Sequence, residues 1–224
     1  ALGDLDAGVQ AGDILIVNHG DNSVYRINPT TGDQRKFGTF NVPTDLAVSP
    51  DGYLYISEYG GTIQRLNLTN GTLSVVNPQT TLWNVNGLAL GPTGDLYATC
   101  ASSNSVVRIN AATGVETEIT RGNLLSIPIG VDVLDADHLV VSSWQANRVV
   151  KVALAGGDQS TVAQGANGLD QPWGIAVDGT NIYVAAKDSK LLQRISGTTV
   201  TTVRQMPSPM FGIGIETNSD IVVG

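Results

Sequence analysis

The sequence predicts an all-β fold, a β-propeller of four-stranded blades with five full repeats and a partial one, so that the ring is five- or six-bladed. Three observations favour this fold. Short apolar runs recur about every 42 residues, turns containing Gly and Pro separate these runs, and segments with helical periodicity are nearly absent. Four antiparallel strands in a repeat of roughly 40–45 residues are typical of a propeller blade.

The first strand of each repeat is a short apolar run that opens with Gly or Asp. Successive runs start 42, 43, 44 and 38 residues apart. We expect these runs to be the inner strands of the blades, at residues 45–48, 87–90, 130–133, 174–177 and 212–215.

The other strands of each repeat follow in the same order. The second strand is a short apolar run, at residues 14–16, 54–56, 96–98, 139–141, 182–184 and 221–223. The third strand carries one cation at a fixed place, namely Arg26, Arg65, Arg108, Lys151 and Arg194. The fourth strand is more polar, at residues 34–37, 73–76, 115–119, 160–162 and 200–203. All are rich in the alternating β-branched and aromatic residues that strands favour.

These repeats divide one domain, residues 1–224, into blades. The blades lie near residues 12–40, 41–83, 84–125, 126–168 and 169–206, with a partial one at 207–224. Residues 212–215 either supply the first strand of blade one and close a five-blade ring, or begin an incomplete sixth blade. A third alternative is that the chain belongs to a longer protein.

Composition excludes several classes of protein. Of the 224 residues, 42% are hydrophobic and 14% charged, which excludes a disordered polyelectrolyte. No apolar run approaches the ~18 residues of a membrane-spanning helix, so we expect no membrane insertion. The net charge is −8 and the cations are scattered, whereas nucleic-acid binding requires clustered cations. We therefore expect no nucleic-acid partner.

The sequence favours an extracellular protein. It has few lysines and many Thr, Ser, Asn and Gly residues. We expect any signal peptide to have been removed, because no charged and apolar leader follows Ala1. Asn67 and Asn70 begin overlapping Asn-x-Thr triplets and are possible glycosylation sites. The single cysteine, Cys100, forms no internal disulfide, and its place in a predicted strand favours a buried, inert thiol.

Two stretches carry a resemblance to known families. Asn147-Arg-Val-Val-Lys-Val152 resembles the NHL repeat, and the segment 49–58, Ser-Pro-Asp-Gly-Tyr-Leu-Tyr-Ile-Ser-Glu, resembles blades of gluconolactonase/SMP-30 and streptogramin-lyase propellers. The resemblance covers essentially the whole chain and implies a propeller fold. It does not select one function, because such propellers include lactonases, lyases and binding modules.

The resemblance also implies where a site would lie. In gluconolactonase-like enzymes the residues before the inner strands hold a divalent cation at the channel mouth. The equivalent positions here are Thr44, Asn86, Ile129, Trp173 and Phe211. Asn86 matches the family's Asn, but the others offer no carboxylate for a cation such as Ca²⁺, which takes six to eight oxygen ligands. We therefore expect no metal, no cofactor and no catalytic residue at these positions.

A lyase of this group needs a general base and a metal. The chain has two histidines, His19 and His138, which the predicted strand order places at opposite ends of their strands. A shared histidine site is therefore not expected. A metal-dependent hydrolase or lyase, with Ca²⁺ as its cofactor, remains the alternative function.

The apolar residues at the mouth suggest binding or packing. Trp173 and Phe211 occupy equivalent positions in adjacent repeats, with Ile129 beside them. The sequence favours a plug that fills the channel, and the alternative is an exposed surface that stacks on a sugar or a protein. Trp83 and Trp144 lie elsewhere in the repeat and are expected to be structural.

The function that the sequence favours is a non-enzymatic, secreted scaffold or binding propeller. The partners expected are a second copy of the chain, another protein or a glycan. An unfinished last blade would expose a strand edge, with Asp220, Ile221, Val222 and Val223 as its candidate residues. Pairing of that edge with the head of another copy is heterologous and would build a ring or a fibre.

Overall fold

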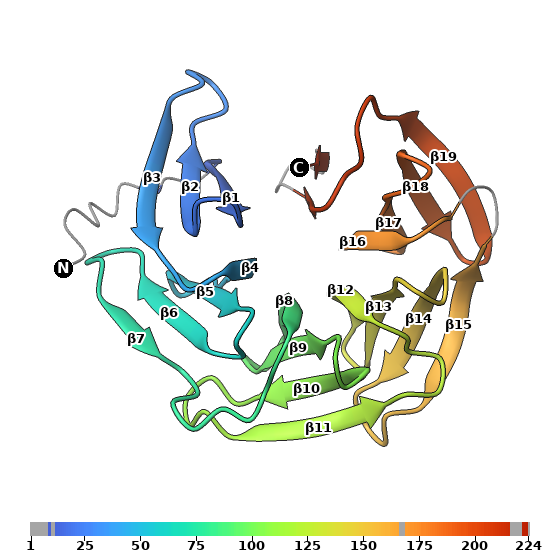
Figure 1. The fold of residues 1–224 in the computed structure, drawn as a ribbon, viewed down its shortest axis with the longest axis horizontal. Helices are drawn as coiled ribbons and strands as arrows, with labels where there is room; N and C mark the ends of the chain where they lie inside the picture. The colour runs from blue at the N-terminus through green and yellow to red at the C-terminus, as the bar shows by residue number, and fades with distance from the viewer. Residues whose placement is uncertain (1–8, 10–11, 166–168, 216–220, 224) are drawn as a thin grey trace.

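The structure, a computed structural model, describes residues 9, 12–165, 169–215 and 221–223. In this part of the chain every regular element is a β-strand, and the strands form six antiparallel sheets. The sheets follow one another around a common centre (Figure 1). The predicted all-β propeller is therefore confirmed. Among the described residues no helix is long and apolar enough to cross a membrane.

Four of the sheets have four strands each, and their strands follow the chain from the centre outward. In chain order they are β4 (Pro43–Val48), β5 (Tyr53–Glu58), β6 (Ile63–Asn67), β7 (Leu73–Val75); β8 (Val85–Leu90), β9 (Leu96–Cys100), β10 (Ser105–Ile109), β11 (Glu116–Arg121); β12 (Pro128–Asp135), β13 (His138–Ser143), β14 (Arg148–Ala153), β15 (Gln159–Gln164); and β16 (Pro172–Asp178), β17 (Asn181–Ala186), β18 (Leu191–Ser196), β19 (Thr199–Gln205).

The two remaining sheets flank the gap in the ring (Figure 1). The first has three described strands, β1 (Ile14–Asn18), β2 (Ser23–Ile27) and β3 (Gln34–Thr39). The last has two, β20 (Ile213–Ile215) and β21 (Ile221–Val223). The inner strands predicted at 45–48, 87–90, 130–133, 174–177 and 212–215 lie within or overlap β4, β8, β12, β16 and β20.

The closure of a five-blade ring by residues 212–215 is not what the structure shows. β20 pairs with β21, with Gly214 opposite Val222, and it lies beside β16. Within the described residues β1 pairs only with β2. The tail therefore begins a further sheet after the fifth blade, which was the second of the sequence-based alternatives.

The hydrophobic core lies in layers between neighbouring sheets. One layer joins the sheets of β4 and β8 and includes Ile63, Leu88 and Leu96, and equivalent layers follow around the ring. Every residue of β9 is buried, because this sheet has a neighbour on each face. That double burial explains why the second strands are apolar along most of their length instead of alternating with polar residues.

The inner strands approach one another so closely that glycine is required between them. A Cβ added to Gly87 would lie 2.3 Å from the carbonyl oxygen of Ile129 in the next blade. At Gly130 the same atom would lie 2.6 Å from the carbonyl oxygen of Trp173. Contacts this short do not occur for real Cβ atoms, so these glycines set the spacing of adjacent blades.

Buried hydroxyl groups join the same strands by hydrogen bonds. The Thr99 hydroxyl accepts a hydrogen bond from the Gly87 N–H at 2.8 Å and donates one to the Ile129 carbonyl at 2.5 Å. One blade further on, the Ser142 hydroxyl accepts from Gly130 N–H at 2.7 Å and donates to the Trp173 carbonyl at 2.5 Å. Each hydroxyl uses both its donor and its acceptor capacity, so its burial costs little.

The substitution Gly87→Ala tests this spacing. We expect it to lower the free energy of unfolding by about 1–3 kcal/mol, the usual cost of overpacking a core, because the new methyl group would meet backbone atoms of the next blade. Gly212→Ala is the matched control, since it occupies the same repeat position and no atom lies within 4 Å of its added Cβ. The measurement is urea denaturation of both variants, and equal effects would contradict the close-approach argument.

Candidate functional site

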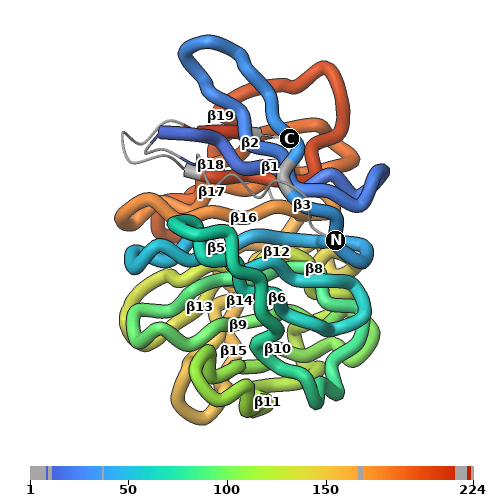
Figure 2. The backbone as a smooth tube through the Cα atoms, turned by 90° about the vertical axis from the view of Figure 1, so that its left-hand side faces the viewer, coloured from blue at the N-terminus to red at the C-terminus, as the bar shows by residue number. Residues whose placement is uncertain are grey.

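The antiparallel strand order gathers three kinds of loop on one face of the ring. The inner strands begin there, the turns between second and third strands lie there, and the segments that join consecutive blades end there. We call this face the mouth face. Seen from the side, the turns gather on two opposite faces of the molecule (Figure 2).

A repeated backbone contact fixes residues on the mouth face. The residue before each of β4, β8, β12 and β16 has a left-handed backbone, with φ of 53° at Val42, 55° at Asn84, 49° at Ile127 and 47° at Gln171. Its carbonyl accepts a hydrogen bond from the first residue of the following turn, and these turn residues are Tyr59, Ala101, Trp144 and Lys187. A left-handed β-branched residue is strained, and such strain is concentrated at functional sites.

Four side chains from three consecutive sheets converge at this face. Trp173 contacts Phe211 edge to face, with ring centroids 5.4 Å apart, and contacts Trp144 in the same way at 6.0 Å. The Lys187 ammonium lies over all three rings, 4.6 Å from the Trp173 centroid, 5.3 Å from that of Phe211 and 5.8 Å from that of Trp144. We call these four residues the aromatic cluster.

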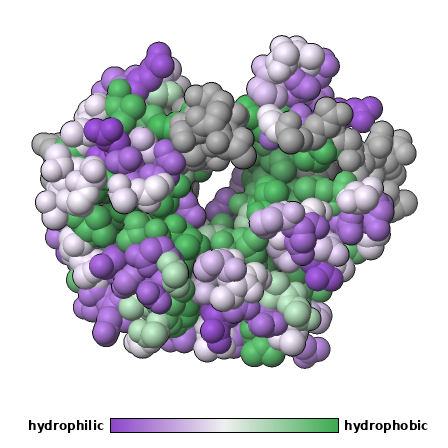
Figure 3. Space-filling model, turned by 180° about the vertical axis from the view of Figure 1, so that it is seen from behind, coloured by the Kyte–Doolittle hydropathy of each residue, from purple (hydrophilic) through white to green (hydrophobic). Residues whose placement is uncertain are grey.

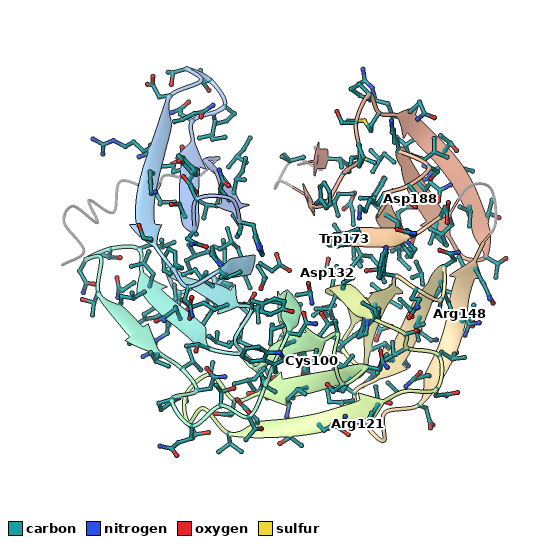
Figure 4. All side chains as sticks on the ribbon, viewed as in Figure 1. Cys100, Arg121, Asp132, Arg148, Trp173 and Asp188 are labelled. Carbon is teal, nitrogen blue, oxygen red and sulfur yellow. The ribbon has the colours of Figure 1, made fainter. Side chains whose placement is uncertain are left out.

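The positive charge of Lys187 in the aromatic cluster is not neutralised by a described carboxylate. Within the described residues the Lys187 ammonium has no carboxylate at ion-pair distance, and the three ring faces are its contacts. Such cation–π contacts contribute about 0.5–1 kcal/mol each at exposed sites. Figure 4 shows Trp173 beside the centre of the ring. Phe211 is 50% exposed, so the cluster presents apolar surface and a cation together.

Hydrogen bonds hold the cluster in place. The Trp144 indole N–H donates to the Gln171 side-chain oxygen at 2.7 Å, and the Gln171 backbone N–H donates to the Asn147 side-chain oxygen at 2.8 Å. These contacts link the β13–β14 turn to the start of β16. The arrangement is therefore positioned by two blades before any partner arrives, which lowers the entropic cost of binding.

The five residues predicted at the mouth have different roles. Trp173 and Phe211 are brought together, Trp173 half-buried and Phe211 exposed, whereas Ile129 is buried. The Thr44 hydroxyl lies 2.9 Å from the Ser57 hydroxyl, and the Asn86 amide donates to the backbone and side-chain oxygens of Asn84 at 3.0 Å. Thr44 and Asn86 are thus engaged locally and do not join the aromatic cluster.

Metal ligands and histidines do not converge in the described part of the chain. No group of three or more His, Cys, Asp or Glu side chains there could hold a metal ion. His19 follows β1 on the mouth face, whereas His138 begins β13 on the opposite face, where its Nδ1 lies 2.8 Å from Asp135 Oδ1. The strand order therefore places the two histidines on opposite faces, as the sequence predicted.

Two carboxylates join neighbouring inner strands by hydrogen bonds near the centre of the ring. Figure 3 shows an opening at the centre that is bordered largely by hydrophobic residues. Asp45 accepts the N–H groups of Leu46 and Leu88 at 2.8 Å. Asp132, labelled in Figure 4, accepts those of Val133 at 2.7 Å and Val177 at 2.8 Å. Burial raises the pKa of Asp45 to about 7, with a smaller increase from the Asp132 charge, and burial also raises the pKa of Asp132.

The other residues singled out from the sequence lie apart from this site. Asn67 ends β6 and Asn70 lies in the β6–β7 turn on the opposite face, where Asn67 Oδ1 accepts the Thr69 N–H at 2.8 Å and Asn70 is exposed. Cys100 is buried at the end of β9, as predicted, and burial raises the pKa of its thiol to about 11. Ile221, Val222 and Val223 form β21, whereas Asp220 lies outside the described residues.

Sequence reasoning missed Trp144 and Lys187, although a signal was present. Both are the first residue after the second strand of their blade, in register with Tyr59 and Ala101. Trp173 and Phe211 likewise share one repeat position. The cluster therefore arises from two repeat positions in successive blades, and aligning the turns as well as the strands would have found it.

Comparison with solved structures shows the fold. The chain is similar to one from a nidogen/laminin complex, with 14% identity, a TM-score of 0.81, and coverage of 94% of this chain and 84% of that one. It is similar to virginiamycin B lyase from Staphylococcus aureus (20% identity, TM-score 0.74, 96% and 74% coverage) and to the calcium-binding protein regucalcin from Agrobacterium tumefaciens (16%, 0.74, 91% and 74%). No protein-family model and no curated protein matches the chain.

These comparisons confirm the family resemblance at the level of fold. The neighbours include the streptogramin-lyase and SMP-30-like propellers to which the sequence is similar. They range from a chain of a protein complex to lyases, so the fold alone selects no function.

The raised pKa of Asp45 predicts a pH dependence of stability. Because this carboxyl is protonated more readily in the folded than in the unfolded chain, the folded state binds more protons between about pH 4 and pH 7. The free energy of unfolding should therefore be higher at pH 5 than at pH 8. Asp45→Asn should reduce that difference, whereas Asp158→Asn, at an exposed position, should not. A pH dependence unchanged in Asp45→Asn would contradict the assignment.

Proposed function

We propose that this protein is a binding propeller that docks a protein partner on its mouth face through the aromatic cluster. The observation that carries the proposal is the convergence of Trp144, Trp173, Phe211 and Lys187 from three consecutive sheets. Tryptophan is enriched among the residues that dominate binding energy at interfaces, and a preformed cluster binds at low entropic cost.

The fold is compatible with this proposal. The structurally similar chain in the nidogen/laminin complex belongs to an assembly between proteins. That neighbour is 14% identical, so it supports only the use of such a propeller in protein binding. The lyase neighbours represent the alternative chemistry, for which the described residues supply no group of candidate metal ligands.

A location outside the cell is part of the proposal. It is supported by the composition, with few lysines and many Thr, Asn and Ser residues, and by the two Asn-x-Thr triplets. Asn70 is exposed in a turn on the face opposite the mouth, so a glycan there would leave the aromatic cluster free. This placement makes glycosylation and mouth-face binding compatible.

A second candidate, end-to-end association, is favoured by the described strands nearest the two ends of the chain, each of which pairs with one described strand only. Within the described residues β1 pairs only with β2 and β21 only with β20. An edge strand presents unpaired N–H and C=O groups to which another strand can add. β21 is β-branched and carries no charge, so nothing in Ile221, Val222 or Val223 opposes such pairing.

Peptide selection tests the role of the aromatic cluster. Peptides selected on the native protein from a random phage-displayed library should bind Phe211→Ala and Trp173→Ala at least about tenfold more weakly, because each variant removes a ring of the cluster. Trp83→Ala is the control, since Trp83 is another exposed tryptophan outside the cluster. Selected peptides that bind both cluster variants as tightly as the native protein would contradict the proposal.

Sedimentation velocity tests end-to-end association. The mean sedimentation coefficient of the chain should rise with concentration, and Val222→Lys should abolish the rise, because a charge blocks an edge strand. A native chain that sediments as a monomer at the highest attainable concentration would rule out this second candidate and leave mouth-face binding unaffected.

A further inference from the structure

A cavity of about 210 Å³ lies away from the centre of the ring. It is formed between the β7–β8 segment, which contributes Trp83, and the next sheet, which contributes Ser103 from the β9–β10 turn and Glu118 and Arg121 from the outer strand β11. Figure 4 shows Arg121 on the outer side of this sheet, well away from Trp173 and the centre. The cavity is thus separate from the aromatic cluster.

One wall of the cavity is lined by Trp83. Trp83 is 60% exposed, although its ring is held on one side by an edge contact with Tyr59, whose centroid is 5.8 Å away. Its backbone carbonyl accepts a hydrogen bond from the Ser102 hydroxyl at 3.2 Å, which ties the backbone of Trp83 to the β9–β10 turn. The backbone that carries this aromatic ring is therefore fixed at the border of the cavity.

The opposite wall is polar and also fixed. The Ser103 and Ser105 hydroxyls lie 2.7 Å apart, and Arg121 donates to the Ser103 carbonyl at 3.2 Å. Arg121 Nε donates to Glu118 Oε1 at 3.1 Å, and a second guanidinium nitrogen contacts the other Glu118 oxygen. The wall thus offers hydroxyls that donate and accept, a carboxylate that accepts and a guanidinium that donates.

The chemistry of the two walls excludes most ligand classes. A wholly apolar ligand would desolvate the serines and the ion pair without replacing their hydrogen bonds. An anion would face the carboxylates of Glu116 and Glu118, and a cation would face Arg121. A neutral ligand with many hydroxyl groups and one apolar face satisfies both walls. Pockets for drug-sized ligands measure roughly 300–1,000 Å³, so this smaller cavity suits a single ring.

We propose that this cavity binds one pyranose ring of a neutral sugar. The C–H face of the ring stacks on Trp83, and its hydroxyls exchange hydrogen bonds with Ser103 and with the Glu118–Arg121 pair. Cys100 also lines the cavity, and burial raises the pKa of its thiol to about 11. The proposal is independent of the aromatic cluster.

Nuclear magnetic resonance titration with three methyl pyranosides, of glucose, galactose and mannose, tests the site. We expect at least one of them to bind the native chain saturably, with sorbitol, which has the hydroxyls but no ring, failing to bind. Trp83→Ala should weaken binding at least about tenfold and Trp83→Phe much less, because phenylalanine keeps an aromatic face. Phe211→Ala, in the aromatic cluster, is the matched control and should bind as the native chain does.

Three outcomes would overturn the proposal. None of the pyranosides binds at about 100 mM, or binding survives in Trp83→Ala, or sorbitol binds as well as the pyranosides. Binding that is lost in Phe211→Ala and kept in Trp83→Ala would also overturn it, because the sugar would then occupy the aromatic cluster. Circular dichroism of each variant confirms that the sheets are intact, which is expected because Trp83 is mostly exposed.

Discussion

The close approach of neighbouring inner strands is the constraint on which this structure depends. At Gly87, Gly130 and Gly174 the backbone of the next blade occupies the space that a side chain would need. Thr99 and Ser142 use the same approach to bridge one strand to the next by hydrogen bonds. The spacing between inner strands is thereby fixed, and the apolar second strands pack in the layers between sheets.

The spacing of the inner strands also determines which side chains lie at the mouth face. The left-handed residue before each of β4, β8, β12 and β16 directs its carbonyl to the following turn, so that turn is fixed relative to the centre. In two successive blades these turns carry Trp144 and Lys187, while Trp173 lies in β16 and Phe211 precedes β20. The backbone repeats from blade to blade, but the side chains at equivalent positions differ. The repeated backbone therefore carries an asymmetric cluster.

The repeat spacing was enough to predict the fold and the inner strands, since each apolar run is needed for burial in every blade. It was not enough to predict the aromatic cluster, because Trp144 and Lys187 lie in turns, whose side chains the apolar pattern does not constrain. The sequence did not decide whether residues 212–215 join blade one or begin a further blade, because this apolar run matches an inner strand in either position. Only the structure shows that β20 pairs with β21. The role of Asp45 was not predictable, because one of its two N–H donors, Leu88, comes from the inner strand of the next blade.

The central claim is that the aromatic cluster is preformed in the free protein. The most direct test is the proton chemical shift of the Lys187 side chain beside its ammonium group, measured by nuclear magnetic resonance without any ligand. With the ammonium over three ring faces, ring currents should move these protons well upfield of the ordinary lysine position, and Trp173→Ala should return them most of the way. Protons at the ordinary lysine position in the native chain would contradict the account.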